Sequence, residues 1–186
     1  MNTRKTLLIA LFTGLIIVGT FIKVPLPPVP ISLQSFFVIL AGMIGGLQIG
    51  LFATVIYLLL GMIGLPVFST GGGLAALIAP TGGYLFGMLL AVIVVGIFSD
   101  RIKAGANKKG HIVLCAIGGI LGTLVIYAVG LPWLKNALDM SWSKTLVAGM
   151  YPFLIGDMIK LIVALIITFN FKEKFDLLIL KETDES

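Results

Sequence analysis

Two charged side chains lie inside one long apolar segment near the end of the chain. Asp157 and Lys160 belong to residues 149–171, which are otherwise almost entirely uncharged. On a helix, residues three apart project from the same side, about 60° apart. A carboxylate beside an ammonium can form an ion pair, and together they offer a hydrogen-bond acceptor next to a donor. The spacing therefore predicts a polar site that binds a small ligand through complementary groups.

An ion pair that only fixes helix packing is the alternative interpretation. Such a pair contributes little net stability, because the cost of desolvation offsets the attraction. A charge at the centre of a bilayer costs about 2.5–3.5 kcal/mol on insertion scales, so charges within a span usually mark a functional site. We therefore favour the ligand-binding role for Asp157 and Lys160.

Three further residues are candidates for the same site. Tyr84 opens an apolar segment and can offer its hydroxyl to a ligand, although a position at the membrane interface fits equally well. Gln34 begins another apolar segment, where helix capping is the ordinary role. Gly73 ends a run of three glycines and permits close approach of the backbone to a ligand or to a neighbouring helix. No Gly-Lys-Ser/Thr follows this run, so it is not a phosphate-binding loop.

Enzyme chemistry has little support in the sequence. There is no His/Cys/Glu cluster for a metal ion, no Ser-His-Asp set and no ATP-binding motif. An intramembrane enzyme would depend on Asp157 and Lys160 alone, and this reading stays open as an alternative from another class. A structural membrane subunit without a ligand is a third possibility.

Composition indicates a protein that crosses a membrane several times. Of the 186 residues, 59% are hydrophobic and 11% are charged, whereas a soluble domain carries about 25% charged residues. The mean hydropathy is +1.14. A membrane-spanning helix needs ~20 mostly apolar residues. The predicted spans are 6–22, 33–46, 47–63, 83–99, 112–131 and 149–171.

These spans predict an all-α fold with one transmembrane domain over residues 1–186, a bundle of six helices, and a tail at 172–186. The second and third spans are nearly continuous and meet at Gly45-Gly46-Leu47-Gln48. A tight turn there would make a helical hairpin. One broken helix, with five spans in total, is the alternative.

The basic residues predict the orientation of the six spans. Lysine and arginine are enriched in the cytoplasmic links of membrane proteins. With the N-terminus inside, most of them fall on the inner side, at positions 4, 5, 101, 103, 108, 109, 172, 174 and 181. Only Lys23, Lys135 and Lys144 fall on the outer side. This distribution favours six spans over five and places both termini in the cytoplasm.

The predicted outer links have an unusual composition. Residues 24–32 contain four prolines, which favour an extended and stiff segment. Residues 64–82 have no charge and an apolar middle, so we expect them to fold inward at membrane depth, packed on protein or lining a cavity. The third link, 132–148, holds Trp133 and Trp142, which are typical of the membrane interface. Asp157 and Lys160 would then lie in the outer half of the last span, beneath the first two links.

Small residues repeat at intervals of four along several spans, which lets helices approach closely. The first span has Thr6, Ala10 and Gly14 in such a row. The other rows are Gly42/Gly46/Gly50, Gly83/Gly87 and Gly118/Gly122. Most of these rows must pack helices inside the protein, and spacing alone does not tell which one serves a partner.

Three stretches in this order and spacing resemble the BioY family, the substrate-binding S components of energy-coupling factor (ECF) biotin transporters. They are Pro27–Gln34 followed by Ala41-Gly42, then Pro80-Thr81-Gly82-Gly83-Tyr84-Leu85, and finally Pro152–Lys160 with its Asp-x-x-Lys. The resemblance extends from about residue 5 to residue 171. One departure is Ile155, where many members have proline, but it removes no polar group.

The resemblance implies a fold, a ligand and partners. The fold is a six-helix bundle of the ECF S-component type, with biotin bound near the outer face beneath the first and third inter-helix loops. The partners are a transmembrane coupling protein and two ATPases, which use the ATP, so this chain needs no cofactor and is not an enzyme. Ala10 and Gly14 match the Ala-x-x-x-Ala motif that docks on the coupling protein. The implied location is the cell membrane.

The resemblance also implies how biotin is held. We expect Asp157 to accept a ureido N–H, and Lys160 to donate either to the ureido carbonyl or to the carboxylate. Tyr84 and Phe153 would help apolar loop residues to cover the rings. The full set of expected substrate-binding residues is Asp157, Lys160, Tyr84, Gln34, Gly73, Thr81 and Phe153. An S component for another small vitamin remains the alternative within this class.

Overall fold

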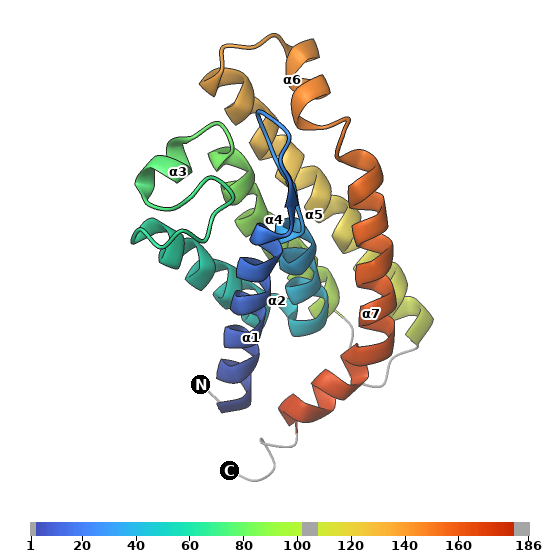
Figure 1. Ribbon diagram of the computed structural model, residues 1–186. Coiled ribbons are helices and arrows are strands. Elements are labelled where there is room, and N and C mark those ends of the chain that lie inside the picture. The colour runs from blue at the N-terminus through green and yellow to red at the C-terminus, as the bar shows by residue number, and fades with distance from the viewer. Residues whose placement is uncertain (1–2, 102–107, 181–186) are drawn as a thin grey trace.

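The computed structural model describes residues 3–101 and 108–180, and these residues are almost entirely helical (Figure 1). The helices are α1 (Thr3–Phe21), α2 (Gln34–Met62), α3 (Leu74–Ile78), α4 (Gly82–Asp100), α5 (Lys108–Ala137), α6 (Trp142–Gly149) and α7 (Leu154–Leu180). Two short strands, β1 (Lys23–Val24) and β2 (Ile31–Ser32), pair in an antiparallel hairpin. Residues 181–186 of the predicted tail and Lys103 of the predicted basic loop lie outside the described residues.

Within the described residues, five helices are long and apolar enough to cross a membrane, namely α1, α2, α4, α5 and α7. Helix α2 is not continuous, because Gly46 has non-helical dihedral angles, with φ of 68° and ψ of −168°. A Cβ placed on Gly50 would lie 3.0 Å from the Cα of Gly42, so the two halves of α2 fold back on one another. The protein is therefore an all-α membrane protein with six long helical segments, as the sequence predicts, and the turn at Gly46 joins the second and third.

Three polar side chains from α4 and α7 satisfy the backbone that is freed at this turn. The carboxylate of Asp100 accepts the backbone N–H of Leu47 at 2.9 Å. The carbonyl of Met43 accepts from the hydroxyl of Ser99 at 2.7 Å, and that of Ile44 accepts from Nζ of Lys172 at 2.9 Å. Within a membrane, an unpaired backbone group costs several kcal/mol, so a broken helix needs such partners.

The rows of small residues have two different roles. Side chains or backbone of neighbouring helices would block a Cβ at Gly42, Gly50, Gly87 and Gly122. These glycines let α2, α4 and α5 approach closely, which confirms the internal packing role predicted for most of the rows. In α1, Ala10 and Gly14 are exposed on the surface of the chain, and no atom lies within 4 Å of a Cβ built on Gly14. The α1 row is thus the one left open for contact with lipid or with a partner.

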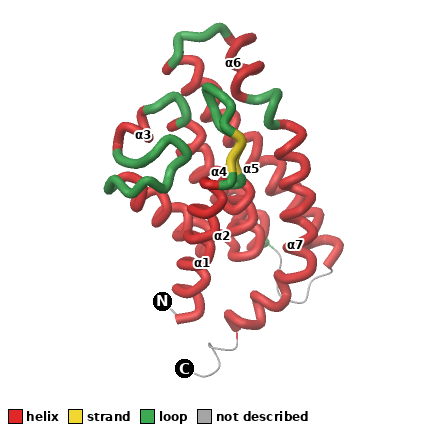
Figure 2. Tube along the Cα trace, in the orientation of Figure 1, coloured by secondary structure: helices red, strands yellow, loops and turns green. Residues whose placement is uncertain are grey.

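Loops and short elements gather at the end of the molecule opposite the start of α1 and the end of α7 (Figures 1 and 2). The proline-rich link 24–32 is not extended throughout, contrary to the prediction from the sequence, because it bends at 27–29 and folds back so that its ends pair as β1 and β2. The uncharged link 64–82 carries α3 and packs part of itself on the core, with Val67, Phe68, Ala76 and Leu77 buried. Leu74 and Ile78 stay exposed.

Two predicted boundaries were wrong at this end. Helix α5 continues through Pro132 to Ala137 instead of ending at residue 131, because Leu134 is fully buried and Nε1 of Trp133 donates to the carbonyl of Ala79 at 3.0 Å. The last long helix begins at Leu154 and not at residue 149, since Gly149 ends the separate helix α6. Ser141 caps α6 by accepting from the backbone N–H of Lys144.

The turn at Gly46 yields a stability prediction. Gly46→Ala should lower the free energy of unfolding by about 1–3 kcal/mol, because only glycine tolerates this backbone conformation. The new Cβ would also collide with the carboxylate of Asp100. Thermal unfolding in detergent micelles measures the effect.

Gly14→Ala is the matched control for this substitution. Gly14 is helical and exposed, with open space around its Cβ position. It should leave the unfolding temperature unchanged or raise it slightly. Equal unfolding temperatures for the two variants would contradict the role assigned to the turn.

Candidate ligand-binding site

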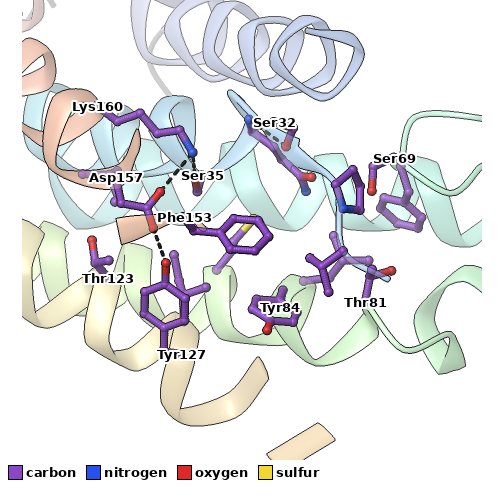
Figure 3. Close-up of a pocket in the computed structure, with 18 of the residues that line it drawn as sticks. Ser32, Ser35, Ser69, Thr81, Tyr84, Thr123, Tyr127, Phe153, Asp157 and Lys160 are labelled. Carbon is purple, nitrogen blue, oxygen red and sulfur yellow. Dashed lines mark hydrogen bonds and ion pairs between the residues drawn. The ribbon is translucent and has the colours of Figure 1, made fainter. Parts of the chain in front are cut away.

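A cavity opens among α2, α4, α5, α7 and the outer links, and Figure 3 shows most of its lining side chains. The empty space, counted out to its open mouth and including open solvent there, is about 770 Å³. The lining combines apolar and polar residues. They are Val29, Pro30, Ser32, Gln34, Ser35, Ile39, Phe68, Ser69, Thr70, Thr81, Tyr84, Leu85, Met88, Thr123, Ile126, Tyr127, Phe153, Asp157 and Lys160.

The polar centre of the cavity is the carboxylate of Asp157. Nζ of Lys160 donates to its Oδ1 at 3.0 Å, and the hydroxyl of Tyr127 donates to its Oδ2 (Figure 3). Lys160 also donates to Oγ of Ser35 at 3.3 Å. The side chains of Lys160 and Asp157 are only 11% and 18% exposed. The predicted ion pair is therefore present, and it ties α7 to α5 and to the start of α2.

The local fold explains why a carboxylate can occupy this position. Asp157 lies in the first turn of α7, where backbone N–H groups favour a negative charge. Its own backbone N–H donates to the carbonyl of Phe153 at 2.8 Å. Each carboxylate oxygen of Asp157 accepts one hydrogen bond and can accept another. The ammonium of Lys160 has three N–H groups and uses two of them, for Asp157 and Ser35. The pair can thus still accept from a ligand N–H and donate to a ligand oxygen.

Gln34 supplies a second polar group to the cavity. Its side chain is 2% exposed, and its Nε2 has no hydrogen-bond partner within the described chain. A buried donor without a partner costs about 1–3 kcal/mol. The side-chain amide of Gln34 does not cap α2, because no side-chain cap bond is present at the start of that helix. The backbone N–H of Gln34 instead donates to Oγ of Ser32, at 3.4 Å. The amide is therefore available to a molecule in the cavity.

The remaining predicted residues divide into two groups. Tyr84, Thr81 and Phe153 all line the cavity, and each is no more than 8% exposed. The hydroxyl of Tyr84 donates to the carbonyl of Gly149 at 2.9 Å, so the cavity receives mainly its ring. Gly73 is not among the lining residues. Its φ of 84° and the bond from its N–H to the carbonyl of Gly61, at 2.7 Å, show that it shapes the turn before α3.

Sequence reasoning missed several lining residues. Tyr127 is the most important, because it holds Asp157, and a lone tyrosine within a predicted span was the available signal. Ser35 follows Gln34 directly and carried no separate signal. Ser69, Thr70 and Met88 come from a loop and a helix face that only the tertiary structure brings to the cavity.

The first two outer links cover the cavity. Val29, Pro30 and Ser32 come from the first link, and Phe68, Ser69 and Thr70 come from the second. The ring of Phe68 packs edge-on against that of Tyr57, with centroids 5.4 Å apart.

Hydrogen bonds hold these two links in place. The hydroxyl of Tyr57 donates to the carbonyl of Val67 at 3.1 Å. Nζ of Lys23 joins the two links by donating to the carbonyl of Ser69 at 2.6 Å. In the described part of the chain, no group of three or more His, Cys, Asp or Glu residues can hold a metal ion.

A helical membrane bundle with a cavity lined by one neutralised ion pair defines a membrane-embedded binding protein, and its fold is that of ECF S components. One solved structure, the S component for biotin from an ECF-type ABC transporter, has a TM-score of 0.78 and 28% sequence identity to this chain, covering 91% of this chain and 90% of that one.

The sequence comparisons agree with the fold. The model described as the BioY family matches residues 1–176, and the chain belongs to this family. It is 39% identical over 171 residues to the biotin transporter BioY of Thermotoga maritima, covering 91% of this chain and 96% of the relative. It is 39% identical over 162 residues to a probable biotin transporter BioY of Lysinibacillus sphaericus, covering 84% and 80%. The protein thus belongs to a family of transporters and not of enzymes.

Coupling within the ion pair can be tested through stability. Lys160→Met should destabilise the ligand-free protein by about 2 kcal/mol, because it leaves the Asp157 carboxylate buried with only Tyr127 and water as partners. Asp157→Asn in the same chain removes that uncompensated charge. We expect the double variant to unfold at a higher temperature than Lys160→Met alone, measured in detergent. If the loss of stability in the double variant equalled the sum of the losses in the two single variants, the two residues would not be coupled.

Proposed function

We propose that this chain is the biotin-binding subunit of a vitamin uptake system and that it delivers biotin to an ATP-driven ECF module. The observation that carries this proposal is the ion pair of Asp157 and Lys160, which lines a cavity in a protein of the BioY family. The relatives and the solved structure indicate the ligand, since each of them is named for biotin.

The ureido ring of biotin has two N–H donors beside one carbonyl, and the ion pair is its complement. Asp157 accepts one ureido N–H, and Lys160 donates to the ureido carbonyl. Tyr127 positions the carboxylate of Asp157, and Ser35 positions the ammonium of Lys160, through hydrogen bonds. Leaving either ligand group without a partner would cost about 1–3 kcal/mol. Specificity therefore comes from the match of donors and acceptors.

Apolar surface accounts for the remainder of the ligand. The thioether ring and the aliphatic chain of biotin fit against Phe153, Met88 and Ile126, and the ring of Tyr84 closes one side. Gln34 offers its unpartnered amide to a ligand acceptor, and Thr81 stands at the edge of the same cavity. The outer links act as a lid, because excluding water strengthens the buried polar contacts. Gly73 contributes only through the shape of the loop that carries α3.

The distribution of basic residues supports a cavity that faces the outer side of the membrane. Most basic residues lie in segments at the end where α1 begins and α7 ends, and basic residues favour the cytoplasmic side. Both termini are then cytoplasmic, and the cavity opens toward the outside. This direction suits a protein that captures a scarce vitamin for import.

The energising partners are a transmembrane coupling protein and two ATPase subunits. The open row on α1, formed by Ala10 and Gly14, is the surface on which the coupling protein docks. Small residues there allow a partner helix to approach closely. The chain itself needs no cofactor, because the partners hydrolyse ATP.

Two alternatives make different predictions. An S component for another vitamin would bind that vitamin and not biotin. An intramembrane enzyme using Asp157 and Lys160 would convert its substrate, and the membership in a transporter family argues against it.

Calorimetric titration of the detergent-purified protein with biotin tests the proposed function. We expect stoichiometric binding by the wild type. Asp157→Asn and Lys160→Ala should each weaken it about 10- to 100-fold, because the first replaces a charged acceptor by a neutral amide and the second leaves a buried ligand carbonyl without its donor. Lys144→Ala is the control, since Lys144 is exposed and does not line the cavity. Wild-type affinity for biotin in both site variants would contradict the roles of Asp157 and Lys160. Binding of a different vitamin in place of biotin would support the first alternative, an S component for another vitamin.

Docking on α1 predicts a separate loss. Ala10→Leu and Gly14→Leu should reduce co-purification with the coupling protein and ATPases about fivefold, because bulk keeps the partner helix away. Biotin binding should stay unchanged in both. Ala128→Leu adds the same bulk at an exposed position of α5 and should have no effect on co-purification. Equal recovery of the module with all three variants would exclude this surface as the docking site.

A further inference from the structure

The interior of the cavity is electrically neutral. Of the described residues that line it, only Asp157 and Lys160 are charged, and they pair with each other at 3.0 Å. The rest of the polar lining consists of hydroxyls and the amide of Gln34. A ureido group is uncharged and fits such a site without disturbing the balance. The carboxylate at the other end of biotin does not fit it.

A carboxylate in the interior would place two negative charges beside one ammonium. Asp157 already uses Lys160 as its counter-ion, so the second anion would be desolvated without compensation. Like charges that share a site disfavour each other strongly. The ligand therefore binds with its ring inward, and its carboxylate points to the mouth of the cavity.

Among the described residues, Lys23 is a cation that lies next to two residues of the cavity lining. Lys23 is paired with Ser32 across the β-hairpin, and its Nζ donates to the carbonyl of Ser69 at 2.6 Å. Ser32 and Ser69 both line the cavity, one from each outer link (Figure 3). Lys23 itself is exposed and does not line the cavity. Its ammonium has three N–H groups and uses one of them for Ser69.

We propose that Lys23 is the counter-ion for the carboxylate of the bound ligand, which fixes a ring-inward orientation. Lys160 then serves the ureido carbonyl and not the carboxylate. Lys23 is a specificity-determining residue at the rim: it favours ligands that carry an anion at the outer end of the chain. This inference rests on the proposed function, since it assumes that the ligand is biotin.

Biotinamide is the probe that separates charge from shape, because it replaces the carboxylate by a neutral amide of nearly the same size. The affinities of both ligands are measured by calorimetric titration for the wild type and for Lys23→Gln in detergent. We expect the wild type to bind biotin about two- to fivefold more tightly than biotinamide at low ionic strength, as for other solvent-exposed ion pairs. This ratio should fall toward one in Lys23→Gln, and also in the wild type at high salt.

The ratio of affinities also controls for loss of the lid contact. Lys23→Gln removes the bond to Ser69, and any loosening of the outer links weakens both ligands alike. Lys144→Gln, at an exposed lysine of α6, should keep the wild-type ratio.

Three results would overturn the inference. A ratio of one in the wild type would mean that the carboxylate has no cation near it. A ratio of ten or more that survives in Lys23→Gln would assign the carboxylate to Lys160. If the wild type bound neither ligand, the proposed function itself would fail, and the inference with it.

Discussion

The carboxylate of Asp157 is the group on which the arrangement of the site depends. It receives one hydrogen bond from Lys160 on its own helix and another from Tyr127 on α5, and Lys160 reaches across to Ser35 at the start of α2. Three long helices therefore meet at one charge. A charge inside a membrane protein is unfavourable unless its partners are in place, so these contacts also constrain how the helices sit together. The same requirement leaves a neutral centre with spare donors and acceptors, and this is what a polar but uncharged head group needs.

The turn at Gly46 makes this meeting possible. It returns the chain after only half of α2, so the segment that carries Gln34 and Ser35 can lie near α7 while both halves pack against α4. Asp100, Ser99 and Lys172 bind backbone groups that the break in the helix leaves without helical partners. These polar groups lie far from the ligand site along the helices, yet they hold the first half of α2 in position. The protein thus has a polar cluster at each end of the bundle, one for binding and one for the fold.

The outer links differ from the helical bundle in how they are held. Phe68 and Val67 are buried, and Tyr57 and Lys23 fix the second link through bonds to backbone carbonyls. Much of the remaining surface of these links is exposed and apolar, including Leu74 and Ile78. The helices beneath these links pack closely through glycines such as Gly42, Gly50 and Gly87. This contrast suits a membrane protein that must admit a solute without unfolding its site.

The sequence by itself determined the class of the protein, the number of long helical segments and the two charged residues of the site. Hydrophobic segments follow from the thickness of the bilayer, and a charge within such a segment stands out because it is unfavourable there. Residue spacing also predicted that Asp157 and Lys160 share one side of a helix, because helical periodicity is local. The BioY motifs pointed to Gln34, Thr81, Tyr84 and Phe153, and all four line the cavity.

Only the tertiary structure decided what those residues touch. Tyr127 is thirty positions from Asp157, and Ser35 is further still from Lys160, so no spacing rule connects them. The hydroxyl of Tyr84 is bonded to Gly149, and Gly73 shapes a turn outside the cavity, because packing with distant segments outweighs what each residue type suggests alone. The rows of small residues were equal in sequence, and burial alone separated the exposed row on α1 from the others. Such contacts arise from the folding of one helix against another, which a linear pattern does not encode.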